Sequence, residues 1–587
     1  MRRLILLAGV LVVPVLAASP AAAADNVICV NNPGGSCDQN VATIPQAITA
    51  ANGNAVADTI RVAAGTYSDG PYQLDGTAHA VTLQGAGQGA TVLTLAANVA
   101  SQTYLNAGNQ VTVKNLTITM AGTSSDGDIG LSLQHAVADH VTVDGSTVVN
   151  ARGGAAGSST ITNSVFVTPP ASGPGTTALS SSGGNTITDT SLTGSVGLNL
   201  SDPGTVDTVS RISIRADGTG VTTDGGTVAI DDAVIDLGTS INGVGLGAVN
   251  FNNGTSAKAI NANHVTIVGG GAASRGAWAY AAAPGAKTTS TVTLTNSIVR
   301  GPATSLVADA GNDGAQGGPS TATVTVSYSD FQSTGGTIGP NGAGGLTTGA
   351  GNVANVDPAF VNPAGGDYRL TPGSPVVDKG DPAAGGPSTD RDGTARVIDG
   401  DAVPGARRDM GAYELPDSVA PDTTVSGGPS GLTVDATPTF TFSSVAGATF
   451  KCRIDAAPYA TCVSPFTSAA LADGAHTLSV FATDLANNAD ATPATRAFTV
   501  DATAPDTTVT KPAKRTTKKK VKLVFASEAG ATFECQVDGQ AWRVCTSPLK
   551  LKVKEGKHTV LIRATDAAGN VDATPAKVKF KRVPKQH

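Results

Sequence analysis

The chain has 587 residues, of which 71 are Gly and 32 are Pro, whereas only 14% are charged and 4% are aromatic. This composition disfavours a helical bundle, and 40% hydrophobic residues with marked periodicity argue against a disordered chain. The formal net charge is −7, and a chain of this length is expected to form several domains.

The N-terminal residues have the three parts of a secretory signal peptide. Arg2 and Arg3 supply a positive region, residues 4–16 an apolar region, and residues 21–24 a small-residue cleavage site. We therefore expect residues 1–24 to be removed and the protein to be extracellular or held at the cell surface. The apolar run is too short to span a bilayer, and no later stretch approaches the ~20 apolar residues of a membrane helix. No transmembrane segment is predicted.

The six cysteines fall into three close pairs, and the last two pairs share one spacing. In an oxidising compartment such pairs predict local disulfides. Zinc is disfavoured because no pair has a His pair nearby at ligand spacing. The expected disulfides are Cys29–Cys37, Cys452–Cys462 and Cys535–Cys545.

A short helix is predicted directly after the first cysteine pair. Thr43 and Gln46 have the spacing of a capping box, and Ile44, Ala47 and Ala51 lie on one apolar face together with Ile48. Such a helix suits the open end of a repeat core.

One short pattern recurs through the middle of the chain. It consists of an apolar residue, any residue, a polar or turn residue that we call the marker, two further residues and a second apolar residue. Successive markers are 18 to 32 residues apart, so the pattern is constant while the connections vary. This is typical of a solenoid, whose coils stack about 4.8 Å apart. The markers are Asn115, Gly145, Asn163, Asp189, Arg211, Asp232, His264, Asn296 and Tyr328.

Residues 25–350 resemble the right-handed parallel β-helix family typified by pectate lyases. The segments 58–62, 64–67 and 81–87 match the first coils of that family. The resemblance implies an all-β solenoid with an N-terminal cap. Lyases of the family need acidic residues that hold calcium and a basic residue that abstracts a proton, and its hydrolases need paired Asp residues. Neither set is recognisable here. The sequence lacks Gly-His-Gly, Asn-Thr-Asp and Arg-Ile-Lys, which counts against the galacturonase branch.

The repeat register itself predicts the best candidate site. Asp189, Arg211, Asp232 and His264 are consecutive markers and should stack in one column, where carboxylates, a guanidinium and an imidazole can form a catalytic site. The same column contains Asn markers, which favours a polar ladder or surface ion pairs instead. A weaker candidate lies beside an early coil and consists of Asp139, His140 and Asp144.

Residues 351–415 resemble the terminal segment of bacterial surface β-helices that is grouped with choice-of-anchor domains. The motifs are residues 357–360, 367–370, 372–375, 390–393 and 409–413. Either this segment attaches the protein to something, or it is a C-terminal cap for the solenoid.

Residues 421–501 and 505–583 are a tandem duplication. Residues 421–425 match 505–509, and residues 448–452 match 531–535. Alternating strands and regular turns predict two β-sandwich modules that resemble bacterial Ig-like repeats, whose usual role is spacing or adhesion.

The second module carries a large excess of positive charge, which has two interpretations. From Thr503 onward, 18 Lys and Arg face 7 Asp and Glu, a balance of +11, which indicates either adhesion to an anionic polymer or, preferably, a solvated basic face. Nucleic acid is not an expected partner, because the protein is exported and poor in aromatics.

Two acidic clusters suit Ca²⁺ ligands or, preferably, Asx turns, and no cofactor is demanded. They are Asp484, Asn488 and Asp490, and Asp566, Asn570 and Asp572.

We therefore predict a monomeric, noncatalytic protein that binds a polysaccharide or another cell-envelope polymer. The alternative is a polysaccharide lyase, hydrolase or epimerase with a cleft between the loops 121–139, 272–290 and 302–322. Purely structural spacing is a third possibility.

Overall fold

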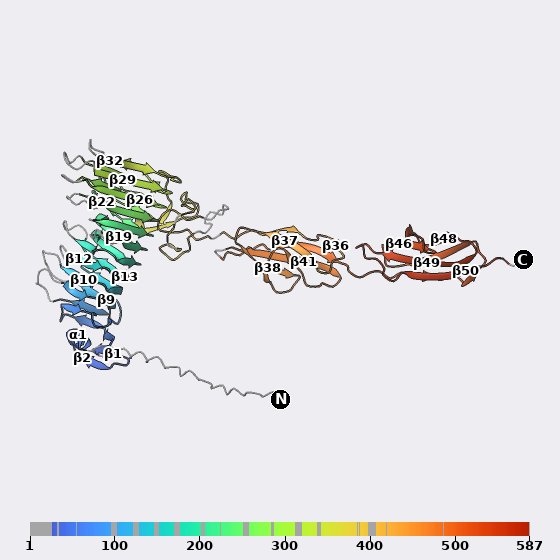
Figure 1. Ribbon diagram of the computed structural model, residues 1–587, viewed down its shortest axis with the longest axis horizontal. Helices are drawn as coiled ribbons and strands as arrows, with labels where there is room; N and C mark the ends of the chain where they lie inside the picture. Colours follow the sequence, from blue (N-terminus) through green and yellow to red (C-terminus); the bar gives the residue numbers. More distant parts are fainter. Residues whose placement is uncertain are drawn as a thin grey trace, which may run out of the picture. The chain divides into compact units, whose positions relative to one another are not determined.

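The computed structural model describes residues 26–585 apart from short gaps. The chain divides into two compact units, residues 1–416 and 417–587. Both are built almost entirely of strands, which confirms the all-β prediction (Figure 1). The predicted signal peptide lies outside the described residues, and no described helix has the length and hydropathy to cross a membrane. The gaps are 32–33, 54–55, 96–102, 121–127, 146–151, 170–175, 201–205, 224, 251–256, 283–286, 312–319, 337–341, 384, 387, 397–406, 418 and 485–486.

Strands β1 to β32 of the first unit form a solenoid in which the strands pair in parallel with the equivalent strands of the next coil (Figure 1). Each full coil contributes one strand to each of three sheets, which we name A, B and C in chain order. Sheet A consists of β1 (Asn26–Val30), β2 (Gln39–Val41), β3 (Asp58–Val62), β6 (Val81–Gln84), the first half of β9 (Val111–Thr119) and of β11 (Val137–Asp144), β13 (Thr160–Thr162), β16 (Thr186–Thr188), β18 (Asp207–Ser210), β20 (Gly226–Asp231), β23 (Lys258–Asn263), β26 (Thr289–Thr295), β29 (Ser320–Ser327) and β32 (Gly342–Thr348). Sheet B consists of β4 (Gly65–Tyr67), β7 (Thr91–Thr94), the second half of β9 and β11, β14 (Val165–Val167), the first part of β17 (Ser191–Leu200) and of β19 (Ser213–Thr223), β21 (Val234–Asp236), β24 (Thr266–Val268), β27 (Ile298–Val299) and β30 (Asp330–Phe331). Sheet C consists of β5 (Tyr72–Leu74), β8 (Thr103–Ala107), β10 (Ile129–Gln134), β12 (Arg152–Gly157), β15 (Thr177–Ser181), the last part of β17 and β19, β22 (Val244–Asn250), β25 (Arg275–Ala281), β28 (Thr304–Ala310) and β31 (Thr334–Gly335).

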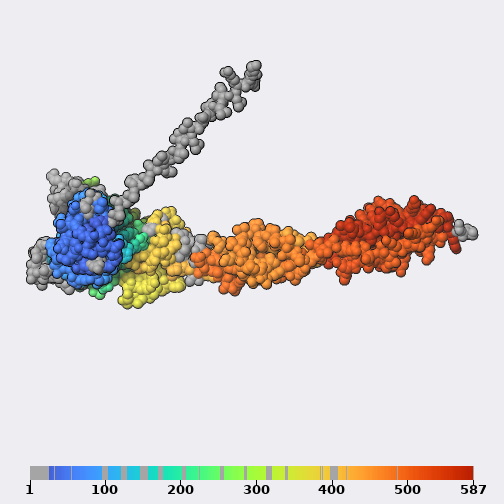
Figure 2. Space-filling view, turned by 90° about the horizontal axis from the view of Figure 1, so that it is seen from below, coloured from blue at the N-terminus to red at the C-terminus, as the bar shows by residue number. Residues whose placement is uncertain are grey.

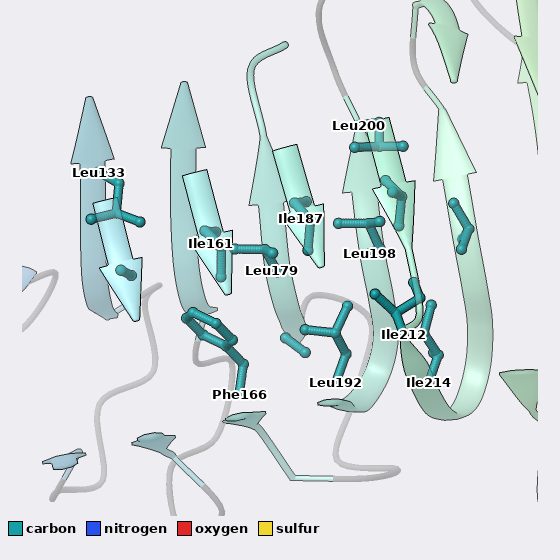
Figure 3. Packing of buried hydrophobic residues seen from close by; sticks show 14 of the residues in the cluster. Leu133, Ile161, Phe166, Leu179, Ile187, Leu192, Leu198, Leu200, Ile212 and Ile214 are labelled. Atoms are coloured by element: carbon teal, nitrogen blue, oxygen red, sulfur yellow. The ribbon is translucent and has the colours of Figure 1, made fainter. Parts of the chain in front are cut away.

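A single apolar column fills the space between the three sheets. Side chains alternate between inside and outside along each strand, so each coil supplies a few buried residues. Ile161, Phe166 and Leu179 come from sheets A, B and C of one coil and are fully buried (Figure 3). Ile187 and Leu192 take the equivalent places on the next coil. Apolar side chains at equivalent positions of successive coils thus stack on one another and form one continuous core from Ile28 to Phe331.

Eight of the nine predicted markers form the turn between sheets A and B. Their φ angles lie between 47° and 58°, in the left-handed region, which lets the chain turn sharply between two strands. One predicted marker is wrong. His140, with a φ of 53°, occupies the place assigned to Gly145, because Ala138 pairs with Val113 and Val141 with Leu116. The apolar residues of that coil fit the pattern in two registers, and strand pairing selects the earlier one.

A column of glycines stands where sheets B and C meet on four consecutive coils. A Cβ atom on Gly245 would lie 2.5 Å from the carbonyl oxygen of Gly276 and 2.6 Å from Cγ2 of Ile267. The equivalent glycines face a β-branched side chain of the next coil at 2.2 to 2.4 Å. The corner is therefore closed to any side chain. These glycines are Gly197, Gly220 and Gly276.

The helix α1 (Ile44–Asn52) closes the first coil as predicted. The Thr43 hydroxyl accepts a hydrogen bond from the Gln46 backbone N–H, and the Gln46 side chain accepts one from the N–H of Ala42. Ile44, Ala47 and Ala51 are fully buried in the solenoid core.

Residues 351–416, which we call the lateral segment, pack along the side of the coils (yellow in Figure 2). The segment contains β33 (Phe360–Asn362), the short helix η1 (Pro363–Gly365) and β34 (Asp367–Leu370). Its contacts extend from Ile212, whose carbonyl accepts from Arg391, to Phe331, whose carbonyl accepts from Asn355. The segment predicted as a cap for the end of the solenoid thus also runs along its side. The reason is that sheet B carries outward apolar residues, and the segment covers them. Val234, Val268 and Ile298 of sheet B pack against Tyr368, Leu370, Met410 and Ala412.

The second unit contains two β-sandwich modules of the same strand arrangement. Each has a three-stranded and a five-stranded sheet, and each has one of the predicted disulfides; the third joins Cys29 to Cys37. The first module has β35 (Thr424–Gly427), β37 (Thr439–Ser443) and β40 (Phe466–Thr467) in one sheet, and β36 (Leu432–Thr433), β42 (Ala494–Val500), β41 (Gly474–Thr483), β38 (Thr449–Ile454) and β39 (Ala460–Cys462) in the other. The second has β43 (Thr508–Thr510), β45 (Lys520–Ala526) and β48 (Leu549–Lys552), and β44 (Arg515–Thr516), β50 (Ala576–Arg582), β49 (Gly556–Thr565), β46 (Thr532–Val537) and β47 (Arg543–Cys545).

Candidate functional site

The four candidate catalytic residues do stack on consecutive coils, but they form two different environments. Asp189 and Arg211 are partly exposed and form a bidentate ion pair, with Nε and Nη2 of Arg211 each 2.7 Å from a different carboxylate oxygen. Hydrogen bonding to Asp189 raises the pKa of Arg211. Both carboxylate oxygens accept a hydrogen bond from the guanidinium, so the two side chains form a closed pair at the surface.

Asp232 lies beneath the lateral segment and has no exposed surface. Arg396 donates from Nη2 and Nε to one Asp232 oxygen at 2.5 and 3.0 Å, and from Nη1 to Glu414 at 3.1 Å. Burial raises the pKa of Asp232 to about 6, although the positive charge of Arg396 acts in the opposite direction. The pair is a buried structural contact that a polymer in solution cannot reach.

His264, the next marker, is also completely buried, and neither of its ring nitrogens has a hydrogen-bond partner. Burial lowers its pKa well below the ordinary value of 6.5, and the charges of Arg396 and Arg408 lower it further. The imidazole is therefore neutral, and it packs as an apolar ring under the lateral segment.

A cavity of about 390 Å³ lies within the lateral segment and has an acidic lining. Asp390 is almost fully buried there; one of its oxygens accepts from the backbone N–H groups of Asp392 and Thr394, and the other from that of Glu414. These bonds hold a turn together. The cavity is lined by Val361, Arg369, Leu370, Asp390, Asp392, Thr394, Glu414 and Pro416.

The weaker candidate beside the early coil is a polar ladder at the surface. Asp139 accepts hydrogen bonds from His140 Nδ1 at 2.8 Å, Asn163 Nδ2 at 2.9 Å and Thr162 Oγ1 at 3.0 Å. Partial burial acts to raise the pKa of Asp139, but these donors lower it below the ordinary value. Asp144 lies further along the same strand, in sheet B, and is not part of this cluster.

An aromatic pair on sheet C was not singled out from the sequence. Trp278 and Tyr280 alternate on β25 with three alanines of the core, so both project outward, and their ring centroids are 5.2 Å apart. Trp278 donates from Nε1 to Asp309 on the next coil at 2.8 Å, and the Arg275 guanidinium lies 4.6 Å from its ring centroid. The signal was present, because Trp278 is one of only two tryptophans in the chain.

The neighbouring coils surround the Trp278 and Tyr280 pair with small or short side chains. On the preceding coil, β22 places Gly247 directly beside Trp278, so no side chain stands there. On the following coil, Val307 pairs with Trp278 and Asp309 with Tyr280. The described contacts of the lateral segment are with sheets A and B and their turn. We call Arg275, Trp278, Tyr280 and Asp309 the aromatic platform. The segments 121–139, 272–290 and 302–322 were proposed as loops that wall a cleft. Their described parts contain the strands β10, β25 and β28 of sheet C, and other parts lie outside the described residues.

The acidic clusters of the two modules form Asx turns. In the second module one Asp566 oxygen accepts from the backbone N–H groups of Gly569 and Asn570, and the other from the Asn570 side chain, which also donates to the Asp501 carbonyl. Asp484 and Asn488 repeat this arrangement with the Asp417 carbonyl. Among the described residues, no group of three His, Cys, Asp or Glu side chains is arranged to hold a metal ion.

Residues 416–502 match the family model of the bacterial Ig-like domain. This match supports the assignment of the first β-sandwich module. No curated protein sequence matches the chain.

Solved structures that resemble parts of the chain include the following three, which all have TM-scores below 0.5, so none of the three bears on function. The fibronectin(III)-like modules of Clostridium thermocellum CbhA share 16% identity, with 28% of this chain and 98% of that chain covered and a TM-score of 0.20. The catalytic unit of a GH87 α-1,3-glucanase from Streptomyces thermodiastaticus shares 17%, with 58% and 71% covered and a TM-score of 0.34. Dimeric latent PorU from Porphyromonas gingivalis shares 16%, with 30% and 22% covered and a TM-score of 0.12.

Proposed function

We propose that the protein is an exported, noncatalytic glycan-binding protein whose solenoid binds a polysaccharide at the aromatic platform of sheet C. The observation that carries this proposal is the outward projection of Trp278 and Tyr280 from a β-sheet beside a glycine. An indole and a phenol ring offer large apolar surface with a polar edge, a combination favoured at binding sites.

The polar residues of the platform suit a hydroxylated ligand. The indole N–H is fixed by Asp309, and the Arg275 guanidinium packs near the indole ring, so the Trp278 side chain is held in one orientation before a ligand arrives. Guanidinium and carboxylate groups at the edge of an aromatic surface can donate to and accept from sugar hydroxyls. Parallel strands stacked in register also give the sheet a long, regular surface that suits a linear polymer.

The buried state of Asp232 and His264 supports a noncatalytic role over the lyase, hydrolase or epimerase alternative. A general acid or base must come within hydrogen-bond reach of the substrate. Asp232 and His264 have no exposed surface, and Asp189 is neutralised by Arg211. The predicted signal peptide and the three disulfides support export.

The test measures binding and chemistry together on neutral and acidic polysaccharides, with the bound fraction, new reducing ends and unsaturated-uronate absorbance recorded on each sample. We expect binding without product, and Trp278→Ala should weaken it at least about tenfold, as for a contact in the centre of an interface. Trp542→Ala, which removes the other tryptophan, is the matched control and should leave binding unchanged. Product formation by the unsubstituted protein, or equal loss of binding in both tryptophan variants, would overturn the proposal.

A further inference from the structure

The two β-sandwich modules can be compared position by position. The backbone N–H of Phe442 donates to the Ser464 hydroxyl at 3.0 Å, and that of Phe525 donates to the Ser547 hydroxyl at 3.0 Å. This shared contact fixes the correspondence of the strands β37 and β45, and of β40 and the start of β48. Thr439 of the first module is thus equivalent to Lys522 of the second.

Four lysines lie on the outer face of the three-stranded sheet in the second module. Lys520 and Lys522 on β45 are exposed and alternate with buried Val521 and Leu523. On the neighbouring strand Lys552 lies directly opposite Lys520, and Lys550 directly opposite Lys522. Residues two apart on a strand are about 7 Å apart. We call this square array the four-lysine face.

This arrangement is unfavourable for the free protein, because like charges directly opposite each other on a sheet repel. The fold does not require it. At the equivalent cross-strand pair the first module has Thr439 and Thr467, whose hydroxyls hydrogen-bond at 2.8 Å. Thr437 and Ala469 take the other two places. The same β-sandwich therefore exists with a neutral face and with a strongly cationic one.

The acidic residues of the second module do not neutralise the four-lysine face. Within the described residues 503–585, the ion pairs join His558 to Asp538, Arg563 to Glu534 and Arg582 to Glu555. The five-stranded sheet also carries exposed cations, but they are directly opposed in only one row, where Lys581 lies between Lys557 and Arg515, and carboxylates are interspersed there.

We propose that the four-lysine face binds a linear polyanion that carries repeated phosphate or carboxylate groups. Lysine ammonium groups are compact point charges without the planar fork of arginine, so the array responds to charge density more than to the shape of each anion. The negative charges of a bound polymer would lie between or beside the opposed ammonium groups and offset their mutual repulsion. This site is independent of the aromatic platform and gives the protein a second point of attachment.

The composition of the face favours a polymer without bases over single-stranded nucleic acid. The exposed residues of β43, β45 and β48 are lysines, threonines, Val524 and Ala526, and the aromatic Phe525 points into the module core. Proteins that bind single strands combine cationic grooves with exposed aromatic rings on which bases stack, and these strands offer none.

The experiment uses the full chain and two variants of equal charge. The face variant carries Lys520→Thr, Lys522→Thr, Lys550→Thr and Lys552→Ala, the residues of the first module. The matched control carries Lys557→Ala, Lys577→Thr, Lys579→Ala and Lys581→Thr, again the equivalent residues, on the other sheet. Affinities for inorganic polyphosphate, polygalacturonate and poly(dT) are measured at several salt concentrations, together with the melting temperature of each protein without polymer.

We expect the unsubstituted chain to bind polyphosphate, polygalacturonate or both, and the relative affinities tell whether phosphate or carboxylate is preferred. The face variant should bind at least tenfold more weakly at about 50 mM salt and show a log–log salt slope smaller by about three to four. It should also melt at a higher temperature, which shows that lost binding is not lost folding. The control variant should change affinity less than threefold.

Three results would overturn the proposal. If neither polyanion binds at low salt, the face is only a solvated surface. Equal losses in both variants would mean that net charge alone matters. Tighter binding of poly(dT) than of both other polymers would assign the face to nucleic acid instead. Polyphosphate has no sugar rings to contact Trp278, so Trp278→Ala should leave the affinity for polyphosphate unchanged, and failure here and failure of the proposed glycan site are distinguishable.

Discussion

Arg396 and Asp232 are 164 positions apart in the sequence and meet in an ion pair in which neither side chain has exposed surface. The contact joins the lateral segment to the turn between sheets A and B. Arg396 also donates to Glu414 and to the carbonyls of Gly411 and Ala412. The Arg396 guanidinium therefore joins the lateral segment to the solenoid and also joins separate parts of the lateral segment to each other.

We expect Arg396→Met to lower the free energy of unfolding of the first unit by about 3–5 kcal/mol, because Asp232 is left buried without a partner. The measurement is urea denaturation of the first unit, combined with limited proteolysis of the lateral segment, which should become susceptible. The matched control is Arg211→Met, which breaks the partly exposed pair with Asp189 and should cost less than about 1 kcal/mol. Adding Asp232→Leu to Arg396→Met should restore much of the loss. Equal effects of the two single substitutions would contradict this interpretation.

The buried imidazole of His264 predicts a pH dependence of stability. Its pKa in the folded protein lies well below the 6.5 of an unperturbed histidine. Below pH 6.5 the unfolded chain therefore takes up a proton that the folded chain does not, and stability falls by up to about 1.4 kcal/mol per pH unit. Above pH 6.5 the residue is neutral in both states and has no effect.

His264→Gln should remove this contribution. Asp232, whose pKa is raised to about 6, acts in the opposite sense, since the folded state binds its proton first as the pH falls. Because both proteins retain Asp232, its effect cancels in the difference. The free energy of unfolding of the unsubstituted protein, minus that of the variant, should decrease as the pH is lowered from 7 to 5. Parallel curves over this range would show that His264 takes up its proton equally in the folded and the unfolded state.

The glycine column predicts opposite outcomes for two neighbouring substitutions. Gly245→Ala places a methyl group within 2.6 Å of backbone and side-chain atoms of the next coil and should cost about 1–3 kcal/mol. Gly247→Ala on the same strand meets its nearest atoms at 3.4 Å, so its stability should stay within about 0.5 kcal/mol of the unsubstituted protein or exceed it. Thermal denaturation of both variants is the measurement, and equal melting temperatures would contradict the tight corner.

The sequence by itself determined the solenoid, its interior and the position of the turns, because each coil contacts mainly its neighbours and inward residues alternate along each strand. The helix cap and the three disulfides depend on residues close in sequence and were predicted for the same reason. The register failed at Gly145, where the spacing of apolar residues allowed two alignments and only pairing between coils selected His140.

Only the tertiary structure decided which outer surfaces of the solenoid are free. Asp189, Arg211, Asp232 and His264 are equivalent positions of one repeat, and nothing local distinguishes the exposed pair from the buried one. The difference comes from the lateral segment, which covers sheet B and introduces Arg396 from far along the chain. The outward direction of Trp278 followed from the alternation of side chains along its strand. The partners that hold its ring could not be predicted in this way: Asp309 lies on the next coil, and Arg275 lies three residues earlier on the same strand. The contact with Asp309 depends on how the coils stack. Local periodicity specifies which side of a strand is buried in the core, whereas long-range packing decides whether the other side reaches solvent.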